Sequence, residues 1–533
     1  MNILKNLLNF FYILKYRSHC SKIFRTKIKN TNKIILTEIN NFYPSMINMP
    51  YLLSVLQKKY SANIAGYFPI NEISKKFYLL SILKFCLPFT SYHIYKSFGL
   101  SRFVLFSLNK EIKIKSKREF KNLSKIKSKK KFLRYRINGI LVGDLFYDTF
   151  LRFNFKETID INDQIFRTFL FNQLRIFYYW DNFFIKNKVK SLILSHSVYS
   201  MAIPLRIAVK KNIPTYISTY STTDFFDKRR IYHLNSKALS QNFNNFDNSI
   251  KNKILKFTKK KLYNNYDVKN NYFPEVSTIN QGSTHIIKKN LNIFGNTKKN
   301  FITQNKKKNI FIFTHCFYDA SHVVRHLFND FYEWLVFLGK LSEETDYNWY
   351  IKRHPHTLNT KLNELVLNNF VKKYKKIKLL PKNLNHNEFL NKVDLALTIY
   401  GSVAYEYPYF SKKVLLPGNF SHFSGYNFCK QAKNIKEYSY FLKNIHKIKP
   451  DFDKKKLCEH YFGMQLNQSD PFNLIKYRIK YKQEFFKPLI FSLLSKEFSL
   501  NRHNELLINL TNFVNSQKYR FLPDQKITNY VKK

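Results

Sequence analysis

The stretch from Asn309 to Gly418 decides the fold. It begins Asn309-Ile-Phe-Ile-Phe-Thr-His315 and continues through Tyr350-Ile-Lys-Arg-His-Pro-His356. It then reads Asp394-Leu-Ala-Leu-Thr-Ile-Tyr-Gly-Ser402 and closes with Lys413-Val-Leu-Leu-Pro-Gly418. Apolar runs of strand length lie in or overlap these segments, bounded by polar or turn-forming residues. We therefore predict strands at Ile310–Thr314, Asn348–Lys352 and Asp394–Ile399, and a further one in Lys413–Gly418.

Helical patterns separate these strands. After the first strand, apolar residues recur at helical spacing, at Leu327, Phe331, Trp334, Leu335, Leu338 and Leu341. Alternating strands and helices are typical of parallel α/β sheets, which bind ligands beyond the carboxyl ends of their strands. We therefore expect the polar residues at the strand exits to share one ligand.

Cationic residues follow the second strand. It ends at Lys352 and leads into Arg353, His354 and Pro355. Proline restricts the residue before it to extended geometry, so the strand stops there and its polar residues turn into the exit loop. These residues are suited to neutralising phosphate groups, and His315, at the exit of the first strand, is assigned to the same donor site.

Gly401 and Ser402 follow the third strand and open a helical pattern. Backbone amides at a helix start bind anions, glycine permits close approach, and Ser402 adds a hydroxyl donor. Glu406 lies four residues later on the same face, where a carboxylate can accept hydrogen bonds from ribose hydroxyls. The alternative for the Gly-Ser pair is a plain helix N-cap.

The N-terminal half repeats the alternation. Strand patterns at Lys33–Thr37 and Ala62–Tyr67 flank a helical pattern at Met49–Lys58, which predicts a βαβ unit. Glu38 follows the first of these strands and so lies at the ligand edge. Its alternative roles are to cap a helix or to pair with a surface lysine.

A second unit follows in the same half. Ser191–Ser195 and Pro214–Thr219 read as strands around a helix at Met201–Lys211, so we expect one doubly wound sheet. His196 lies at a strand exit, where a structural role competes with ligand binding. Residues 71–135 read as helical and Lys-rich.

The segment between these two units contains two carboxylates at helical spacing. Gly139, Gly143, Asp144 and Asp148 lie in it, and on a helix the two aspartates share a face. They are candidates for acid–base chemistry. Their alternative role is to stabilise the helix dipole from the first turn.

The composition favours anionic partners. The net charge is +57 over 533 residues, which suits nucleic acid, an anionic membrane face or phosphorylated substrates. A solvated Lys-rich surface is the alternative. The chain has no zinc-finger spacing, no RNA-binding aromatic signature, no Walker A loop and no GxGxxG, which argues against a kinase, an ATPase or a dehydrogenase.

Five scattered cysteines without a CxxC pair point to a reducing cytoplasm. No apolar run reaches the roughly 20 residues that a membrane span needs. Met1–Tyr16 lacks a signal-peptide cleavage site and is expected to form either an interfacial amphipathic helix or a packing helix. After Pro450 the chain reads as helical, either packing back across both halves or serving as a basic arm.

Residues 309–418 resemble the C-terminal half of bacterial capsule and surface-polysaccharide biosynthesis proteins of the GT-B type. The matching features are His315, Arg353-His354-Pro355, Gly401-Ser402, Glu406, Lys413-Val414 and Pro417-Gly418. Gly139 to Arg152 resembles the G-x-x-x-G-D-x-x-x-D stretch of surface carbohydrate biosynthesis proteins. CDP-glycerol glycerophosphotransferases share a similar His-Pro and Ser-rich arrangement.

The resemblance implies a GT-B-like α/β fold with two Rossmann-like domains facing across a cleft. A nucleotide-activated sugar would bind mainly to the second domain, without a metal ion or other cofactor. The expected segments are 1–30 (amphipathic), 31–300 (acceptor side), 301–450 (donor side) and 451–533 (helical basic tail).

Two metal alternatives arise from the residues. His315, Asp319 and His322 are a candidate metal cluster, with a structural or substrate-binding role favoured. Asp451-Phe-Asp453 has the form of a DxD motif but follows a helix among lysines, so it is discounted.

The resulting hypothesis is transfer of a sugar to a glycan or lipid-linked acceptor in surface-polysaccharide biosynthesis. Lys352, Arg353, His354, Gly401 and Ser402 would hold the donor phosphates, and Glu406 the ribose. The base that activates the acceptor would be Glu38, Asp144 or Asp148, and all three remain candidates. The alternatives are a CDP-polyol phosphotransferase of teichoic-acid type and a non-enzymatic nucleic-acid-binding protein. The expected location is cytoplasmic, with peripheral contact at the inner face of the membrane.

Overall fold

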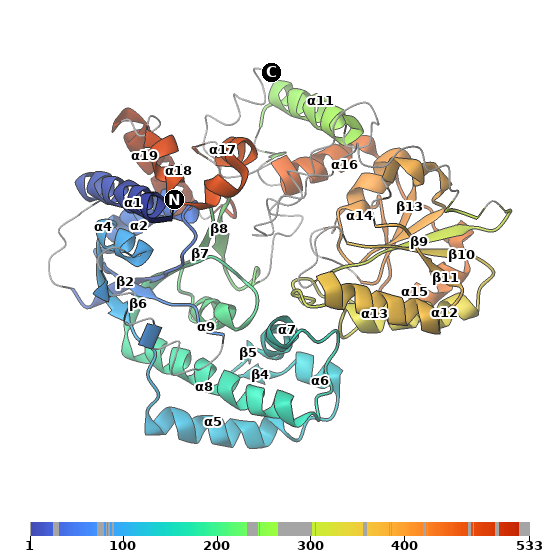
Figure 1. Cartoon of the computed structure of the whole chain (residues 1–533), viewed down its shortest axis with the longest axis horizontal. Coiled ribbons are helices and arrows are strands. Elements are labelled where there is room, and N and C mark those ends of the chain that lie inside the picture. The colour runs from blue at the N-terminus through green and yellow to red at the C-terminus, as the bar shows by residue number, and fades with distance from the viewer. Residues whose placement is uncertain are drawn as a thin grey trace.

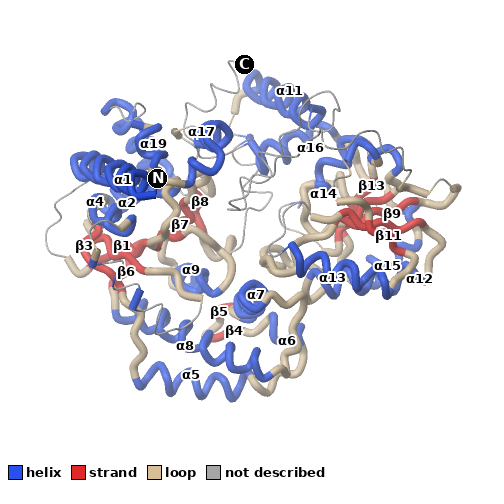
Figure 2. The backbone as a smooth tube through the Cα atoms, in the orientation of Figure 1, coloured by secondary structure: helices blue, strands red, loops and turns tan. Residues whose placement is uncertain are grey.

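The structure of the chain is a computed structural model. It describes residues 2–24, 31–71, 79–80, 83, 86–87, 90–231, 243–244, 246–264, 301–303, 305–354, 360–382, 384, 386–418, 420, 423, 425–466, 471–472, 474–495, 500–516 and 518–521. Two six-stranded sheets organise these residues, one in each half of the chain (Figures 1 and 2). The expected α/β architecture with two Rossmann-like sheets is confirmed.

The N-terminal sheet has the order β3-β2-β1-β6-β7-β8. All neighbouring strands are parallel except β7 and β8, which are antiparallel. The strands are β1 (Lys33–Glu38), β2 (Asn63–Tyr67), β3 (Leu100–Val104), β6 (Lys188–Leu194), β7 (Thr215–Ser218) and β8 (Thr223–Phe226). The helical prediction for residues 71–135 is wrong at β3, which is an edge strand with exposed Ser101 and Arg102 and so lacks a buried apolar run.

Helices cover both faces of this sheet. Since side chains alternate along a strand, Ile34 and Leu36 of β1 pack on one face, while Ile35 packs on the other. The helices of this half are α1 (Asn2–Phe24), α2 (Ser45–Tyr60), α4 (Ile94–Ser97), α5 (Lys110–Leu123), α6 (Lys129–Leu133), α7 (Gly143–Asn154), α8 (Gln164–Lys186) and α9 (Ile203–Lys210). A short hairpin, β4 (Arg136–Ile137) and β5 (Ile140–Leu141), precedes α7.

The absence of a side chain at Gly143 allows α7 to begin close to the end of α6. A Cβ at this position would lie 1.8 Å from the carbonyl oxygen of Phe132 at the end of α6. Because that neighbour is backbone and cannot swing aside, only glycine lets the two helices meet so closely. This contact sets the position of Asp144 and Asp148 in the following turn.

The C-terminal sheet is parallel throughout, in the order β11-β10-β9-β12-β13-β14. Its strands are β9 (Asn309–Phe313), β10 (Asn348–Lys352), β11 (Ile377–Leu379), β12 (Leu395–Leu397), β13 (Lys413–Leu416) and β14 (Lys430–Gln431). The main helices of this half are α11 (Asn248–Asn264), α12 (Phe331–Glu343), α13 (Thr360–Lys373), α14 (Val403–Glu406) and α15 (Ile435–Lys443).

The described C-terminal helices contact both halves. They are α16 (Lys454–Tyr461), α17 (Leu474–Tyr481), α18 (Leu489–Leu493) and α19 (Leu500–Ser516). α16 packs on α14 and α11, whereas α18 packs on α1 and α19 on α2 (Figure 1). Of the two interpretations of this segment, packing back across both halves is the one the structure shows. None of the helices in the described part of the chain is both long and apolar enough to span a bilayer.

Candidate active site

The exit loops of β9, β10 and β12 meet at one edge of the C-terminal sheet, because their strands are parallel. The ring of His315 stacks on Tyr400 with centroids 4.7 Å apart, and it lies 6.3 Å from the ring of His354. The structure therefore brings together three exits that are far apart in the sequence. Pro355 and His356 lie outside the described residues.

His315 is a neutral hydrogen-bonding residue at this edge. Its Nε2 accepts a hydrogen bond from the backbone amide of Ile399 at 3.3 Å and lies 3.2 Å from Thr398 Oγ1. The ring proton therefore resides on Nδ1. Burial, together with repulsion from His354 and His326, lowers the pKa of His315 well below its ordinary value. At neutral pH it contributes no positive charge.

The Gly401 exit is tightly packed. A Cβ on Gly401 would lie 2.8 Å from Thr398 Oγ1, whose hydroxyl oxygen also accepts the amide of Gly401 at 3.2 Å. Ser402 donates to Glu406 Oε2 at 3.0 Å, so the predicted phosphate donor and ribose acceptor contact each other.

The helix expected after Ser402 is shorter than its pattern indicated. α14 lasts four residues and continues as the 3₁₀ turn η6 (Tyr407–Phe410). Pro408 lies in that turn, and proline removes the amide that an α-helix needs there. With so few aligned peptide groups, the helix dipole adds less at this edge than the sequence suggested.

Lys352 and Arg353 are held by their own half of the chain. Lys352 Nζ donates to the carbonyl of Lys382 at 3.0 Å. Arg353 Nε donates to Glu364 Oε2 at 2.9 Å, and its Nη1 donates to the carbonyl of Leu380. Both cations lie at the edge of the C-terminal sheet where the sequence placed them. The donor atoms named above bind acceptors of the protein itself.

Glu38 joins two strand exits of the N-terminal sheet. Its carboxylate is buried and accepts the amide of Ser195 at 3.1 Å and the hydroxyl of Ser195 at 2.5 Å. Ser195 Oγ also lies 2.6 Å from Nδ1 of His196. Within the described ranges, Glu38 therefore neither caps a helix nor pairs with a lysine. It lies at the rim where the sequence placed it.

Asp144 forms a buried ion pair inside the N-terminal half. Arg206 Nη2 of α9 donates to Asp144 Oδ2 at 3.0 Å, and both side chains are almost fully buried. Arg206 also donates to the carbonyl of Leu141 at 3.1 Å. This carboxylate ties α7 to α9 and the β5 hairpin.

Asp148 reaches into the other half of the chain. It accepts hydrogen bonds from Ser321 Oγ at 2.9 Å and from the amide of His322 at 3.0 Å. Its Oδ1 lies 2.6 Å from Nδ1 of His322. The other ring nitrogen of His322, Nε2, is buried and has no hydrogen-bond partner within the described part of the chain.

Of the described histidines around this pair, only His322 forms an ion pair with a carboxylate. Burial lowers the pKa of His322, but the charge and hydrogen bond of Asp148 outweigh it, so the pKa is raised above its ordinary value. The neighbouring His326, whose ring stacks on His322, has its pKa lowered to about 3 by burial and by repulsion from His322. A carboxylate-bound histidine with an unpartnered nitrogen is the arrangement of a general base and its orienting acid.

Further contacts join the halves around this pair. Tyr199, in the loop after β6, donates to Asp319 in the loop after β9. Asp330 accepts hydrogen bonds from Tyr147 and Thr158, each at 2.6 Å. These contacts were not predicted from the sequence. Asp330 carries a capping signal with Glu333 three residues on, but that pattern says nothing of partners in the other half.

The residues considered as metal ligands have separate partners. Asp319 binds Tyr199, His322 binds Asp148 and His315 binds the β12 exit. Among the described residues no three His, Cys, Asp or Glu side chains are grouped as a metal site. Asp453 caps α16, where it accepts the amides of Lys455 and Lys456.

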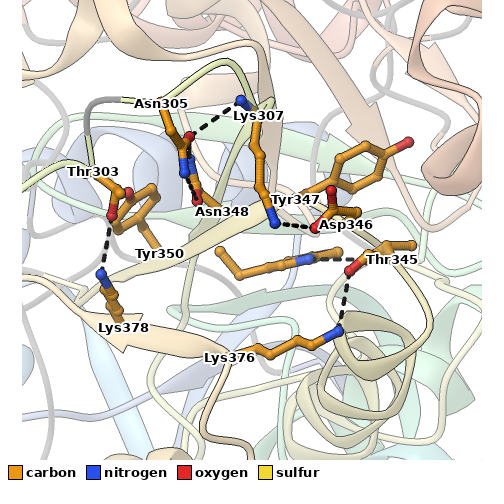
Figure 3. Close-up of a pocket in the computed structure, with 11 residues that line it drawn as sticks. Thr303, Asn305, Lys307, Thr345, Asp346, Tyr347, Asn348, Tyr350, Lys376 and Lys378 are labelled. Carbon is orange, nitrogen blue, oxygen red and sulfur yellow. Dashed lines mark hydrogen bonds and ion pairs between the residues drawn. The ribbon is translucent and has the colours of Figure 1, made fainter.

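A cavity of about 210 Å³ lies at the opposite, amino-terminal edge of the C-terminal sheet (Figure 3). Its lysines are bonded to their neighbours: Lys307 to Asp346, and Lys378 to Thr303 Oγ1 at 3.0 Å. The strand exits described above are at the other edge, so this cavity does not contribute to the candidate site.

No protein-family model and no curated protein matches the chain. Among solved structures it is similar to a UDP-GlcNAc 2-epimerase from Neisseria meningitidis, with 10% identity, a TM-score of 0.25, and coverage of 80% of this chain and 97% of that one. The beta Kdo 2,4 transferase KpsC of Thermosulfurimonas dismutans has 10% identity and a TM-score of 0.32, covering 51% and 79%. A glycosyltransferase from Rickettsia africae has 10% identity and a TM-score of 0.25, covering 86% and 100%. Likeness at this level carries no functional information.

Proposed function

We propose that the chain transfers a sugar from a nucleotide-activated donor to a hydroxyl of a glycan or lipid-linked acceptor, as in surface-polysaccharide biosynthesis. The observation that carries the proposal is the Asp148–His322 pair, with its unpartnered Nε2, between the two halves of the chain. The exit loops of β6 and β9 touch nearby, through Tyr199 and Asp319. Ligands of parallel α/β sheets bind at such exits.

The C-terminal edge is the proposed donor side. His354 and the backbone amide of Ser402 would contact the phosphates, and Glu406 would accept the ribose hydroxyls. The amide of Gly401 already donates to Thr398 Oγ1, so the proposed role of Gly401 is to let the phosphates approach closely. Because Lys352 and Arg353 already donate to protein acceptors, their proposed role is to supply positive potential to the departing phosphate. His315 would hold its neighbours in place as a neutral residue. Preorganised donors and charges of this kind stabilise a leaving group that gains negative charge.

The N-terminal half is the proposed acceptor side. The base would be His322 Nε2, which belongs to the C-terminal half and is oriented by Asp148 of the N-terminal half. It would take the proton of the acceptor hydroxyl as the hydroxyl oxygen attacks the anomeric carbon. The bond from that carbon to the phosphate oxygen breaks, and its electron pair leaves with the nucleotide. Because Nε2 is enclosed, the two halves would have to part to admit the acceptor. Glu38, beside Ser195 and His196, is the alternative base, and Asp144 is assigned a structural role.

The test is a thermal-shift screen of the whole chain against CMP-, CDP-, UDP- and GDP-linked sugars and against CDP-glycerol. A ligand at about 100 times its dissociation constant stabilises the folded state by roughly 2.7 kcal/mol, so a donor raises the melting temperature. Mass spectrometry of the product then identifies the transferred group. Stabilisation by CDP-glycerol alone would favour polyol-phosphate transfer, and no stabilisation by any donor would overturn the proposal.

We also propose that the chain works in the cytoplasm, in peripheral contact with the inner face of the membrane. A lipid-linked acceptor would be found there. Support for this location comes from the net charge of +57, since that face of the membrane is anionic.

A further inference from the structure

α1 is apolar on two opposite faces. One face packs into the N-terminal half through Ile13, Tyr16, Cys20 and Phe24, all of which are buried. Tyr16 stacks on Phe491 of α18 with ring centroids 4.0 Å apart. Its hydroxyl also donates to the carbonyl of Met46 in α2 at 2.9 Å. This face holds the helix against the rest of the N-terminal half.

The other face of α1 is apolar and exposed. At 100° per residue its side chains form one stripe, centred on the side of the helix away from the buried face. The exposed fractions of these side chains run from 37% to 67%. The stripe consists of Leu4, Leu7, Leu8, Phe10, Phe11 and Leu14. Scattered exposed apolar residues are ordinary, but a contiguous stripe of this kind marks an interaction surface.

The surroundings of the stripe are basic. Lys15 and Lys22 are exposed and lie on the same side of the helix as Leu4 and Phe11. No acidic residue precedes Glu38 anywhere in the sequence. A positively charged apolar face is complementary to a surface that has anionic groups on the outside and an apolar layer beneath them. Two copies of the same face would instead repel each other.

We propose that this face of α1 binds an anionic lipid bilayer, with the helix lying in the plane of the interface. Leu7 and Phe11 would enter the boundary between head groups and acyl chains, while Lys15 and Lys22 would contact the head groups. The contact does not depend on the proposed transfer reaction. A second set of exposed leucines, Leu79, Leu80, Leu83 and Leu87, precedes α4, the helix that packs on α1.

The first experiment measures flotation of the full chain with vesicles of phosphatidylcholine, with and without phosphatidylglycerol. We expect binding only to the phosphatidylglycerol vesicles. The double variant Leu7→Gln, Phe11→Gln should bind at least about tenfold more weakly, since it removes two apolar side chains that would enter the boundary between head groups and acyl chains. The matched control is Ile165→Gln, Ile185→Gln on α8, which removes two equally exposed apolar residues and should leave binding unchanged.

The second experiment separates charge from apolar contact. Lys15→Ala, Lys22→Ala should weaken binding several-fold, and added salt should reduce the difference from the wild-type chain. Lys433→Ala, Lys436→Ala, which removes two exposed lysines of the other half, should change binding far less.

Two results would overturn the proposal. One is unchanged vesicle binding by a folded Leu7→Gln, Phe11→Gln variant. The other is a wild-type dimer, measured by light scattering, that this variant converts to monomer, because the stripe would then be an interface between copies. Transfer to a soluble acceptor should be equal in the variant and the wild type, so failure here is distinguishable from failure of the proposed reaction.

Discussion

Asp144 and Asp148 lie one turn apart on α7, yet they belong to different parts of the molecule. Asp144 is satisfied inside the N-terminal half by Arg206, at 3.0 Å. Asp148 binds His322 of the other half, at 2.6 Å, and the other nitrogen of that ring has no partner among the residues that the structure describes. Both oxygens of the Asp144 carboxylate accept hydrogen bonds within one half of the chain, whereas Asp148 joins the two halves. The difference shows that spacing on a helix identifies candidate acids but does not tell which partners they meet.

Removing the unpartnered nitrogen should have the largest effect. His322→Gln should lower the transfer rate by roughly a hundred- to ten-thousand-fold, the usual contribution of a general base, while the chain stays folded. The measurement is the initial rate with the donor found in the thermal-shift screen. His326→Gln, one stacked ring away, is the control and should retain most of the activity. Equal losses in both variants would mean that the cluster is only structural.

Breaking the complete pair should act on stability. Asp144→Asn should lower the free energy of unfolding by about 3–5 kcal/mol, because it leaves the charge of Arg206 buried and unpaired. Urea denaturation measures this change. Asp346→Asn removes an exposed partner of Lys307 and should cost less than about 1 kcal/mol. If the two variants were equally stable, Asp144 would not be the buried structural acid described here.

The pH dependence sharpens the comparison. His322 can accept a proton only when it is neutral, so the transfer rate should rise with pH. The inflection should lie above about 6.5, the ordinary pKa of histidine, because Asp148 raises the pKa of His322. Asp148→Asn should move this inflection to lower pH, because it removes the negative charge that raises the pKa of His322. Rates measured across the pH range test both points. A rate that falls as pH rises through the same region would instead make His322 a proton donor.

The smallest effect is expected at the donor edge. Gly401→Ala places a Cβ 2.8 Å from Thr398 Oγ1, and such overpacking costs about 1–3 kcal/mol. The double variant Gly401→Ala, Thr398→Ala removes the colliding oxygen and should recover part of the loss, which urea denaturation of the two variants would show. Additive losses would indicate that the collision is not the cause.

The local elements were largely predictable. The strands at β1, β2, β6, β7, β9, β10, β12 and β13 follow from apolar runs, and α2, α9 and α12 follow from helical spacing. β3 was missed because this edge strand has exposed residues and so lacks a buried apolar run. β8 was missed because two of its buried residues, Thr223 and Asp224, are polar, so its sequence has no apolar run either. The β4–β5 hairpin was missed although Asn138-Gly139, a strong hairpin signal, was present.

The residues of the candidate site were predicted from the sequence, but the contacts between their side chains were not. The strand exits share an edge because parallel strands require it, so His315, His354 and Gly401 were placed together from the sequence. The acids were proposed as alternatives for the base. The histidine beside Asp148 was considered as a metal ligand, with a structural or substrate-binding role favoured, and not as a base. The roles assigned to Glu38, Lys352, Arg353, Ser402 and Glu406 stay predictions.

The sequence by itself determined the alternation of strands and helices, the edge at which polar residues gather, and the excess of positive charge. These features depend on periodicity and composition, which act over a few residues. The tertiary structure alone decided that Asp148 meets His322, 174 positions away, while Asp144 meets Arg206, 62 positions away. It also decided that one apolar face of α1 is covered and the other exposed. Hydrogen bonds and burial depend on distances between folded elements, and no local pattern encodes those distances.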